Sequence, residues 1–338
     1  MSAWVRHYGS GKVKAIVTGA TGFLGGHVVS HLLNQGWQVI ALGRNTTAGA
    51  KLSQQGAIFK VADIVDLQAL QAVFESADVI FHCAALSSAW GKYDDFYRVN
   101  VIGTRNILSC SQQHNINRIV HVSSTSVYFN FSDRFDIHEN GELSKGFANS
   151  YAETKYLSEQ VLLDENSADT EVVIIRPRGI IGEGDTAIMP RIMKIAQKGW
   201  FPLLNSGSAL VDITYVKNVA HAMLLAAQAE SKKVNGQCIN ISNQQPLTVK
   251  ALLTKVSHHH SGSINLIPIP YFILDSIAFF LEKTSQLFNL DEPILTRYGL
   301  GLLRFSQTLN TDKAQTLLAY KPIYTLDQAI ERYFIDYD

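Results

Sequence analysis

The chain has 338 residues, 46% of them hydrophobic, which is enough for one large domain or for one large and one small domain. Lysine plus arginine and aspartate plus glutamate number 29 each, so the formal net charge of zero gives no sign of a cationic surface for nucleic acid. The three cysteines, Cys83, Cys110 and Cys238, are too widely spaced for a zinc site or a disulfide framework. We therefore expect reduced thiols, a cytoplasmic location and no nucleic-acid partner.

The N-terminal extension, residues 1–12, has no apolar stretch of signal-peptide length. From Val13 onward, short apolar runs alternate with helical patterns. In chain order we predict strand Lys14–Val17, a helix from Phe23 to Gly36, strand Val39–Leu42, a helix from Asp66 to Glu75, strand Val79–Phe81, helix Phe96–Cys110, strand Arg118–Val122, helix Ser150–Leu163 and strand Val172–Ile175. Apolar strands that alternate with helices predict the α/β class, with a Rossmann-type, doubly wound parallel sheet.

The second half of the chain is less regular. We predict helices at Ile188–Gln197, Tyr215–Ala229, Thr248–Val256, Tyr271–Asn289 and near Ile330, and a strand at Gln237–Ile241. Residues 13–185 are expected to form the Rossmann domain, and residues 186–338 a smaller, mostly helical substrate lobe. The strand near 237–241 is expected to return to the main sheet, so that the two parts are interleaved.

One apolar stretch, Ile264–Leu281, reaches the lower limit of the length that spans a membrane. Its only charge is Asp275, but Pro268 and Pro270 interrupt it near its start. Because proline breaks a helix, we predict a short strand or loop followed by a buried helix from Tyr271. Three roles stay open for residues 264–288: a lid over the substrate, part of the core, or a helix in peripheral contact with a membrane surface.

A glycine-rich segment, Thr18-Gly-Ala-Thr-Gly-Phe-Leu-Gly25, lies between the first predicted strand and the first helix. Its spacing suits a dinucleotide: Gly19 permits the tight turn, Gly22 lets backbone N–H groups approach a pyrophosphate, and Gly25 lets helix and strand pack closely. The helix N-terminus favours an anion at the same place. The other residues that we assign to this cofactor-binding loop are Thr21, Phe23 and Leu24.

The end of the second strand indicates which dinucleotide binds. NAD enzymes usually have an acid there for the ribose 2′-hydroxyl, but this chain reads Leu42-Gly43-Arg44-Asn45. Gly43 leaves room for a 2′-phosphate and Arg44 supplies charge, although a solvated loop arginine would give the same sequence. We predict NADP(H) as the favoured cofactor, with NAD(H) as the alternative. Asp63, in the segment Val61-Ala62-Asp63 at the end of a further strand before the helix from Asp66, is placed to accept a hydrogen bond from the adenine amino group.

Tyr151 and Lys155 are four residues apart at the start of a predicted helix and therefore share one face. A lysine ammonium there is expected to lower the pKa of the tyrosine, as proton exchange with a substrate oxygen requires. Ser124 follows the strand Arg118–Val122 at the carboxyl edge of the sheet, where it can hydrogen-bond the same oxygen. Asn100 is placed to orient Lys155 through water or a backbone carbonyl, or else has a packing role.

Together these elements resemble the extended short-chain dehydrogenase/reductase family (the NAD-dependent epimerase/dehydratase superfamily) from about Val13 to Ile330. The matching segments are Thr18–Gly25, Asp63, Phe81–Ala85, Asn100–Thr104, Ser123–Tyr128, Tyr151–Lys155 and Arg176–Asp185. The resemblance implies that Ser124, rather than Ser123, is catalytic, because the family's hydroxyl residue lies three residues before a Val-Tyr pair. It also implies a homodimer formed through a four-helix contact. The further cofactor contacts that it implies are Ile64, Ala84, Ala85, Pro177 and Gly179.

Three features separate subgroups of this family. Dehydratases follow the catalytic hydroxyl residue with Asp-Glu, whereas this chain has Thr125-Ser126. Sugar-nucleotide enzymes typically have a diphosphate-binding arginine where this chain has Val211. The segments Ala209–Val216, Ala89–Gly91 and Arg176–Arg178 resemble the 3β-hydroxysteroid dehydrogenase group and, more closely, bacterial 2-alkyl-3-oxoalkanoate reductases. This resemblance implies a large apolar substrate.

We therefore expect an NAD(P)-dependent enzyme that interconverts a ketone and a secondary alcohol on a small hydrophobic substrate, such as a β-keto acid or a 3β-hydroxysteroid-like compound. Two alternatives stay open: a sugar-nucleotide epimerase with bound NAD, and a non-catalytic NADP-binding regulatory protein. His258-His259-His260 would point in different directions on a helix, so no metal site is expected. The residues that we expect around the substrate are Ser87, Trp90, Thr125 and Arg178.

Overall fold

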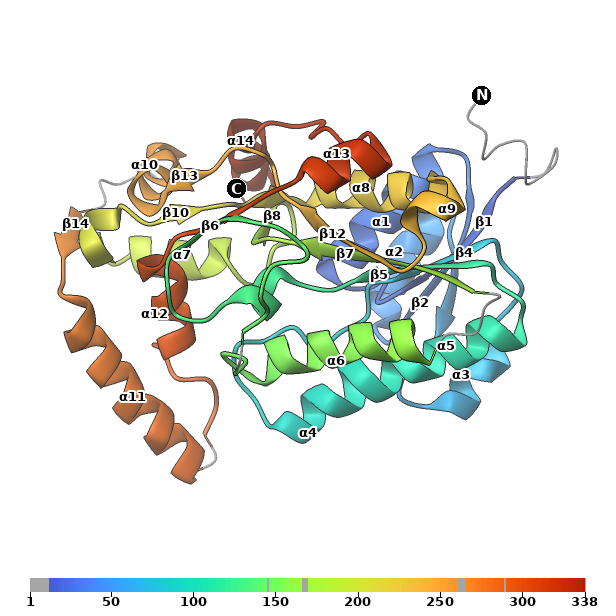
Figure 1. Ribbon diagram of the computed structural model, residues 1–338, viewed down its shortest axis with the longest axis horizontal. Coiled ribbons are helices and arrows are strands. Elements are labelled where there is room, and N and C mark those ends of the chain that lie inside the picture. The colour runs from blue at the N-terminus through green and yellow to red at the C-terminus, as the bar shows by residue number, and fades with distance from the viewer. Residues whose placement is uncertain (1–11, 145, 166–169, 260–264, 289, 338) are drawn as a thin grey trace.

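The computed structural model describes residues 12–144, 146–165, 170–259, 265–288 and 290–337. Its main sheet has seven strands: β1 (Lys14–Thr18), β2 (Gln38–Gly43), β3 (Ile58–Val61), β4 (Val79–His82), β5 (Arg118–Val122), β7 (Glu171–Pro177) and β12 (Gln237–Ile241). They are ordered β12-β7-β5-β4-β1-β2-β3, and every neighbouring pair is parallel (Figure 1). This arrangement confirms the predicted doubly wound α/β class. The predicted N-terminal extension lies outside the described residues, except for residue 12.

Helices cover both faces of this sheet (Figure 1). They are α1 (Phe23–Asn34), α2 (Thr46–Gln54), α3 (Leu67–Val73), α5 (Gly103–Gln113), α6 (Ser150–Asp164) and α8 (Val216–Gln228). Successive strand residues point to opposite faces, so Ala15 and Val17 pack with α1 and α8, while Ile16 packs with α3, α5 and α6. Both layers are closely packed, and the sheet can therefore hold the loops at its carboxyl edge in fixed positions.

Side-chain caps explain where two of these helices begin. Asp66 accepts a hydrogen bond from Ala69 N at 3.0 Å, which confirms the predicted N-cap of α3. Asn149 accepts a hydrogen bond from Ala152 N at 2.9 Å at the start of α6. The second cap fixes the first turn of α6, which carries Tyr151.

Two elements of the first half depart from the sequence prediction. The sequence pattern does not predict α2, because this helix buries little apolar surface and has no clear apolar stripe. The helix predicted at Phe96–Cys110 begins earlier, as α4 (Tyr93–Phe96), and passes through a π-helical segment, Tyr97–Ile102, before α5. Such π-helical turns occur often at functional sites.

The second half of the chain supplies β12 to the main sheet and three helices to the core around it, and the rest forms a lobe with a core of its own. Its small strands, together with β6 from the first half, are β6 (Arg134–Ile137), β8 (Ile180–Ile181), β9 (Trp200–Leu203), β10 (Leu210–Val211), β11 (Thr214–Tyr215), β13 (Leu247–Thr248), β14 (Asn265–Pro268) and β15 (Gln307–Leu309). The lobe helices are α7 (Met189–Ala196), α10 (Val249–His259), α11 (Tyr271–Phe288), α12 (Arg297–Arg304) and α14 (Leu326–Tyr337). The helices α9 (Ser231–Val234) and α13 (Asp312–Leu318) pack with α8 in the core of the main sheet. Met193, Phe201, Leu253 and Ile330 meet in the lobe core.

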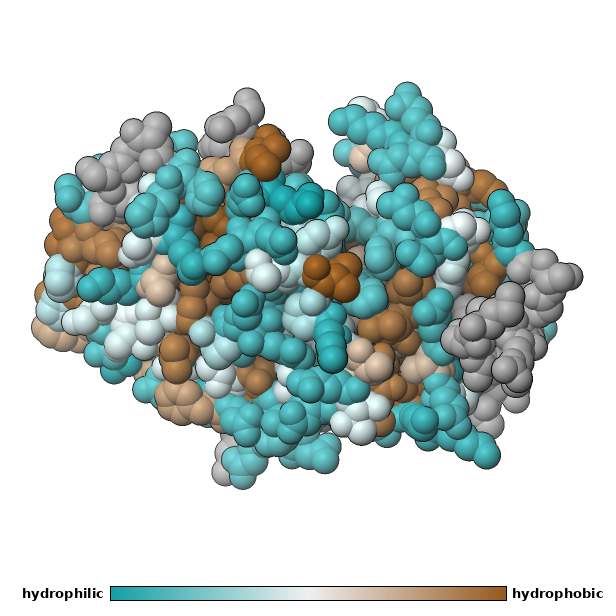
Figure 2. All heavy atoms as spheres, turned by 90° about the horizontal axis from the view of Figure 1, so that it is seen from above, coloured by the Kyte–Doolittle hydropathy of each residue, from teal (hydrophilic) through white to brown (hydrophobic). Residues whose placement is uncertain are grey.

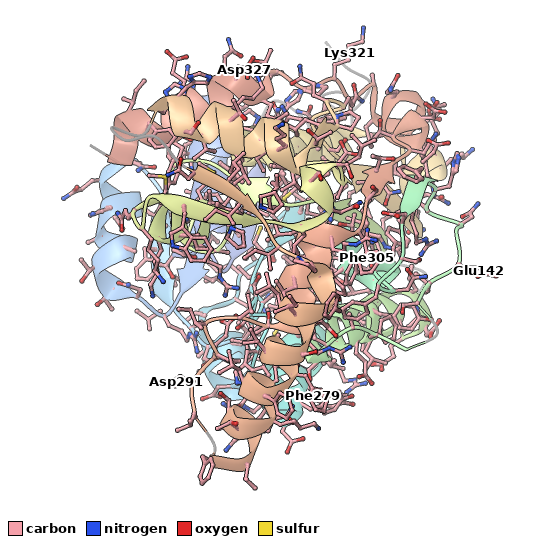
Figure 3. All side chains as sticks on the ribbon, turned by 90° about the vertical axis from the view of Figure 1, so that its left-hand side faces the viewer. Glu142, Phe279, Asp291, Phe305, Lys321 and Asp327 are labelled. Carbon is pink, nitrogen blue, oxygen red and sulfur yellow. The ribbon has the colours of Figure 1, made fainter. Side chains whose placement is uncertain are left out.

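Helix α11 extends away from the main sheet (Figure 1), and Figure 3 looks onto it, with Phe279 labelled along its length. Pro268 ends β14 and Pro270 lies between that strand and the helix, as predicted, but the prediction that the helix is buried is wrong. Only Ala278 and Ser285 are buried, whereas Phe272 is 70% and Leu287 79% exposed. Hydropathy alone does not reveal that the helix packs through one stripe, mainly against α12 and Leu204. Within the described ranges, no helix combines the length and apolarity needed to cross a membrane.

The face of the molecule seen in Figure 2 is mostly hydrophilic. Hydrophobic side chains lie among the polar ones, as on most globular proteins. The balanced charge of the sequence is thus accompanied by a mixed surface on this side.

Candidate active site

The carboxyl edge of the main sheet gathers most of the residues predicted for the site. The segments that follow β1, β4, β5 and β7 all start there, because parallel strands end on the same side. Thr125 Oγ1 donates a hydrogen bond to Pro177 O at 3.3 Å. This bond joins the loop that carries Ser124 to the end of β7, immediately before Arg178.

Three glycines shape the turn between β1 and α1. Gly19 has a φ of +65°, and a Cβ there would lie 2.7 Å from the backbone of Ala84. A Cβ on Gly25 would lie 2.1 Å from Gly19 O. Gly22 is the N-cap of α1, so no side chain caps the first-turn N–H groups, and no acidic residue lies in that turn. The turn therefore fits a pyrophosphate, whose charge the N–H groups and the helix dipole would stabilise.

Arg44 and Asp63, predicted to contact the adenosine end of the cofactor, follow β2 and β3. The Arg44 side chain is 75% exposed and lies 3.5 Å from the Asp63 carboxylate, which also accepts a hydrogen bond from Val65 N at 3.1 Å. A Cβ on Gly43 would lie 2.5 Å from Thr21 Oγ1, so a larger residue there would have to displace the Thr21 side chain. Arg44 thus presents an exposed guanidinium group just after the end of β2.

Tyr151 lies in the first turn of α6. Its phenol forms hydrogen bonds with the hydroxyl groups of Ser124 and Ser87. Burial raises the pKa of the phenol above its ordinary value, and these two hydrogen bonds act in the opposite direction. The structure thereby unites two residues predicted for catalysis and one predicted for the substrate in a single hydrogen-bonded group.

Lys155 lies one turn further along α6 and is only 2% exposed. Burial lowers the pKa of its ammonium group to about 8, while Glu159 and Cys83 act in the opposite direction. Its Nζ lies 3.4 Å from His121 Nε2. The expectation that Lys155 lowers the pKa of Tyr151 is wrong for this arrangement, because burial raises that pKa and the groups that lower it are Ser124 and Ser87.

Two buried histidines, His82 on β4 and His121 on β5, adjoin Lys155. Their ring centres are 5.0 Å apart, and His82 Nδ1 and Nε2 lie 2.7 and 3.0 Å from the hydroxyl oxygens of Thr18 and Thr104. Burial, followed by the charge of Lys155, lowers the pKa of His82 to about 3. Burial, followed by the charges of Lys155 and His82, also lowers the pKa of His121, so both rings are neutral at pH 7. Sequence analysis missed them, although a histidine in each of two apolar strands was a usable signal.

Asn100 lies in the π-helical segment before α5 and is 1% exposed. Its Oδ1 accepts a hydrogen bond from Leu86 N at 2.8 Å, and its Nδ2 donates to Thr154 Oγ1 at 3.0 Å and to Leu86 O at 3.2 Å. These bonds join the loop after β4 to the first turn of α6. Asn100 thus acts on the residue before Lys155, and the orientation of Lys155 through water or a backbone carbonyl stays a prediction.

The other predicted residues follow the strand ends. They are Thr21, Phe23 and Leu24 after β1, Ile64 after β3, Ala84, Ala85 and Trp90 after β4, and Pro177 and Gly179 at the end of β7. Gly179 has a φ of +51°, which favours glycine. No group of three or more histidine, cysteine, aspartate or glutamate side chains that could hold a metal occurs within the described part of the chain, to which His260 does not belong.

A cavity of about 850 Å³ lies between α11, α12 and the loop after β4. Its lining includes Trp90, Phe96, Phe131 and Tyr298, and its volume lies within the usual range for small-molecule sites. Tyr298, which sequence analysis did not predict, comes from α12. Its phenol lies within electrostatic range of Arg178 and Tyr151, and burial raises its pKa to about 12.

The sequence pattern of the 3-beta hydroxysteroid dehydrogenase/isomerase family matches residues 16–266, which contain the glycine turn, Ser124, Tyr151 and Lys155. The chain belongs to this 3-beta hydroxysteroid dehydrogenase/isomerase family. Membership confirms the predicted resemblance and the predicted class of enzyme, an NAD(P)-dependent oxidoreductase of the extended short-chain dehydrogenase/reductase type.

Known relatives and a solved structure match almost the whole chain. The protein is 31% identical to the 2-alkyl-3-oxoalkanoate reductase of Stenotrophomonas maltophilia, over 95% of this chain and 98% of the relative. It is 29% identical to the decarboxylating sterol-4-alpha-carboxylate 3-dehydrogenase of Mus musculus, over 94% of this chain and 89% of the relative. A UDP-glucose 4-epimerase structure from Thermotoga maritima superposes with a TM-score of 0.77 at 19% identity, covering 96% of this chain and 98% of that one. At that identity the likeness shows the fold alone.

Proposed function

We propose that the protein is an NADP(H)-dependent oxidoreductase that interconverts a β-keto acid and a β-hydroxy acid carrying a hydrophobic chain or ring system. The observation that carries this proposal is the hydrogen-bonded pair of Tyr151 and Ser124, with Lys155 one helical turn away, at the sheet edge that holds the glycine turn. The names of both relatives support the substrate class. Each describes a carboxyl group on the carbon next to the one whose oxygen is reduced or oxidised.

The residues at the sheet edge divide the chemistry among them. A bound nicotinamide supplies a hydride to the substrate carbon or accepts one from it. Tyr151 gives a proton to the carbonyl oxygen in the reducing direction and takes it back in the oxidising direction. Ser124 holds the same oxygen through its hydroxyl group. Lys155 keeps a positive charge near the phenol and binds ribose hydroxyls of the cofactor.

Replacing Tyr151 tests the proposed role of its hydroxyl group. We expect Tyr151→Phe to lower kcat by roughly 100- to 10,000-fold, the usual value of a positioned acid or base, and to leave NADPH affinity unchanged. Tyr156→Phe, the same substitution on the same helix, is the matched control and should retain activity. Full activity of Tyr151→Phe would refute the proposal and favour a non-catalytic NADP-binding protein.

Arg44 tests the cofactor preference. We expect wild-type protein to bind NADPH about tenfold or more tightly than NADH, a difference of about 1.4 kcal/mol, and Arg44→Ala to lose that difference. Lys51→Ala, which removes an exposed charge on α2, should keep it. Equal affinity of the wild type for both dinucleotides would refute the preference for NADP(H).

The sugar-nucleotide alternative can be tested by direct binding. Val211 is 8% exposed and lies in β10 beside Gln307 of β15, so it offers neither charge nor a free donor to a diphosphate. We expect no saturable binding of UDP-glucose to the wild-type protein by calorimetry. Tight binding would move the epimerase function ahead of the one proposed.

A further inference from the structure

Arg178 is a buried arginine that no carboxylate of the described residues pairs with. Its exposure is 7%, and its Nε has no hydrogen-bond partner among the described residues. Within the same part of the chain, its guanidinium forms no ion pair, although Asp212 lies within electrostatic range. Burying a charge without partners is costly, and an unpaired cation near the candidate active site therefore indicates a role in binding.

Arg176, two residues earlier, is a buried arginine whose side-chain nitrogens all have hydrogen-bond partners. Its Nε and one terminal nitrogen donate to the two oxygens of Glu159 at 2.8 and 2.5 Å, and the other terminal nitrogen donates to Tyr128 Oη at 2.6 Å. Arg118 is likewise completed by Glu171 and by backbone carbonyl groups. The open donors of Arg178 are therefore not a general property of buried arginines in this chain.

The backbone fixes Arg178 beside the catalytic loop. Its N–H donates to Ile241 O at 3.1 Å, and its carbonyl oxygen accepts a hydrogen bond from Thr214 Oγ1 at 2.5 Å. The preceding Pro177 is bonded to Thr125, the residue after Ser124. Arg178 is therefore anchored on β12 and β11, beside the loop that supplies the hydroxyl group bonded to Tyr151.

Tyr298 connects Arg178 with the reacting end of the site. Its phenol lies within electrostatic range of both Arg178 and Tyr151, and its ring lines the 850 Å³ cavity. Because burial raises the pKa of Tyr298 to about 12, its hydroxyl group stays neutral and can donate a hydrogen bond to an anion.

Asp212 is the carboxylate whose charge acts on Arg178, but it forms no hydrogen bond with the guanidinium group. One of its oxygens accepts a hydrogen bond from Leu309 N at 2.8 Å, while the other has no partner among the described residues. Asp212 thus supports the charge of Arg178 from a distance without occupying its donors.

We propose that Arg178 binds the carboxylate of the substrate and so selects hydroxy and keto acids over the corresponding esters. The inference rests on the proposed function, which places the reacting oxygen at Tyr151 and Ser124. In a β-hydroxy or β-keto acid the carboxyl carbon is two bonds from the reacting carbon. The group that binds the carboxylate therefore has to lie next to Tyr151 and Ser124. A guanidinium suits this task because its planar N–H groups match both oxygens of a carboxylate.

The test compares an acid with its methyl ester in the oxidising direction. 3-Hydroxyoctanoate and methyl 3-hydroxyoctanoate each lose a hydride from C3 to NADP⁺ and a proton from the hydroxyl group, first to Tyr151 and then to solvent. We expect the wild type to prefer the acid by roughly 10- to 100-fold in kcat/KM, the usual value of hydrogen bonds to a charged group. Arg178→Met should abolish this preference, and Arg178→Lys should retain part of it.

The acid-to-ester ratio is measured on one preparation, so a reduced folded fraction cancels from it. Arg297→Met is the matched control: Arg297 lines the cavity but is paired with Asp275 at 2.9 and 3.3 Å, so its loss should leave the ratio unchanged. Equal turnover of acid and ester by the wild type would overturn the inference. An equal loss of both activities in Arg178→Met would do the same, because it would show a structural role.

A binding measurement separates this inference from the proposed function. Octanoate and methyl octanoate are added to the NADP⁺-loaded protein, and the shift in unfolding temperature is recorded. If no hydroxy substrate is oxidised but octanoate stabilises the wild type and not Arg178→Met, the function fails and the carboxylate site stands. If neither ligand is preferred by the wild type, the carboxylate site fails, whatever the enzyme oxidises.

Discussion

Two adjacent glycines of α1 allow a steric requirement to be separated from a helix preference. A Cβ on Gly25 would lie 2.1 Å from Gly19 O and 2.7 Å from the carbonyl carbon of Gly19, both of them backbone atoms. A Cβ on Gly26 would lie 3.5 Å from Ala20 O, which is an ordinary contact. Gly25→Ala and Gly26→Ala therefore add the same methyl group to the same helix in opposite steric situations.

The expected magnitudes follow from these distances. Because carbon atoms pack comfortably at about 3.5 Å, Gly25→Ala forces the turn and the helix apart by roughly 1 Å. Overpacking typically lowers the free energy of unfolding by about 1–3 kcal/mol. The higher helix propensity of alanine offsets at most about 1 kcal/mol of this loss. Gly26→Ala gains the helix propensity of alanine without the steric conflict and should stabilise the protein by about 0.5–1 kcal/mol. For a chain of this size, 1 kcal/mol corresponds to a change in Tm of about 1–2 °C.

Thermal unfolding with and without NADPH measures both effects. We expect Gly25→Ala to lower Tm and to weaken NADPH binding by about tenfold or more, since the displaced turn is the one that fits the pyrophosphate. Gly26→Ala should raise Tm slightly and keep the stabilisation that NADPH gives. A Gly25→Ala protein that bound NADPH as tightly as the wild type would refute the placement of the pyrophosphate at this turn.

Three further predictions concern buried charges. Between pH 6.5 and about 3, the unfolded chain protonates His82 while the folded protein does not, so the free energy of unfolding should fall as pH falls through this window, and less steeply in His82→Gln. Between about pH 8 and 10.5, the unfolded chain keeps the proton of Lys155 while the folded protein loses it, so this group's contribution to the free energy of unfolding should rise with pH. Lys155→Met should lack that rise in urea titrations; an identical slope in wild type and variant would contradict the lowered pKa. Glu159→Gln should cost about 3–5 kcal/mol in urea unfolding because it leaves Arg176 without its charged partner, whereas Glu165→Gln, in an exposed pair, should cost at most about 1 kcal/mol; similar costs for the two variants would contradict this reasoning.

Sequence reasoning recovered the features that local pattern determines. The glycine turn, most strands of the main sheet and the spacing of Tyr151 and Lys155 each follow from residues close together in the chain. The N-cap Asp66 is confirmed for the same reason, since a capping side chain bonds only three residues ahead.

The features that depend on distant contacts were not predictable. Tyr298 reaches the site because α12 packs beside it, and no motif marks that residue. The pKa of Tyr151 depends on how far the fold buries its phenol, which the spacing to Lys155 does not contain. Helix α11 was misjudged because hydropathy counts apolar residues without showing whether another element covers them.

The parallel pairing of β12 with β7 also constrains how the chain is made and how it can be divided. During synthesis, β7 emerges before β12. The backbone groups along its apolar edge, Val172 to Ile175, therefore stay unpaired until β12 has been translated. An uncovered strand edge of this composition promotes aggregation. A chain cut after Asp185 would contain the glycine turn and Tyr151 but would leave that edge open permanently. The nucleotide-binding half therefore cannot be transferred to another protein by itself. Any exchange of lobes between relatives has to keep residues 237–241 together with the main sheet.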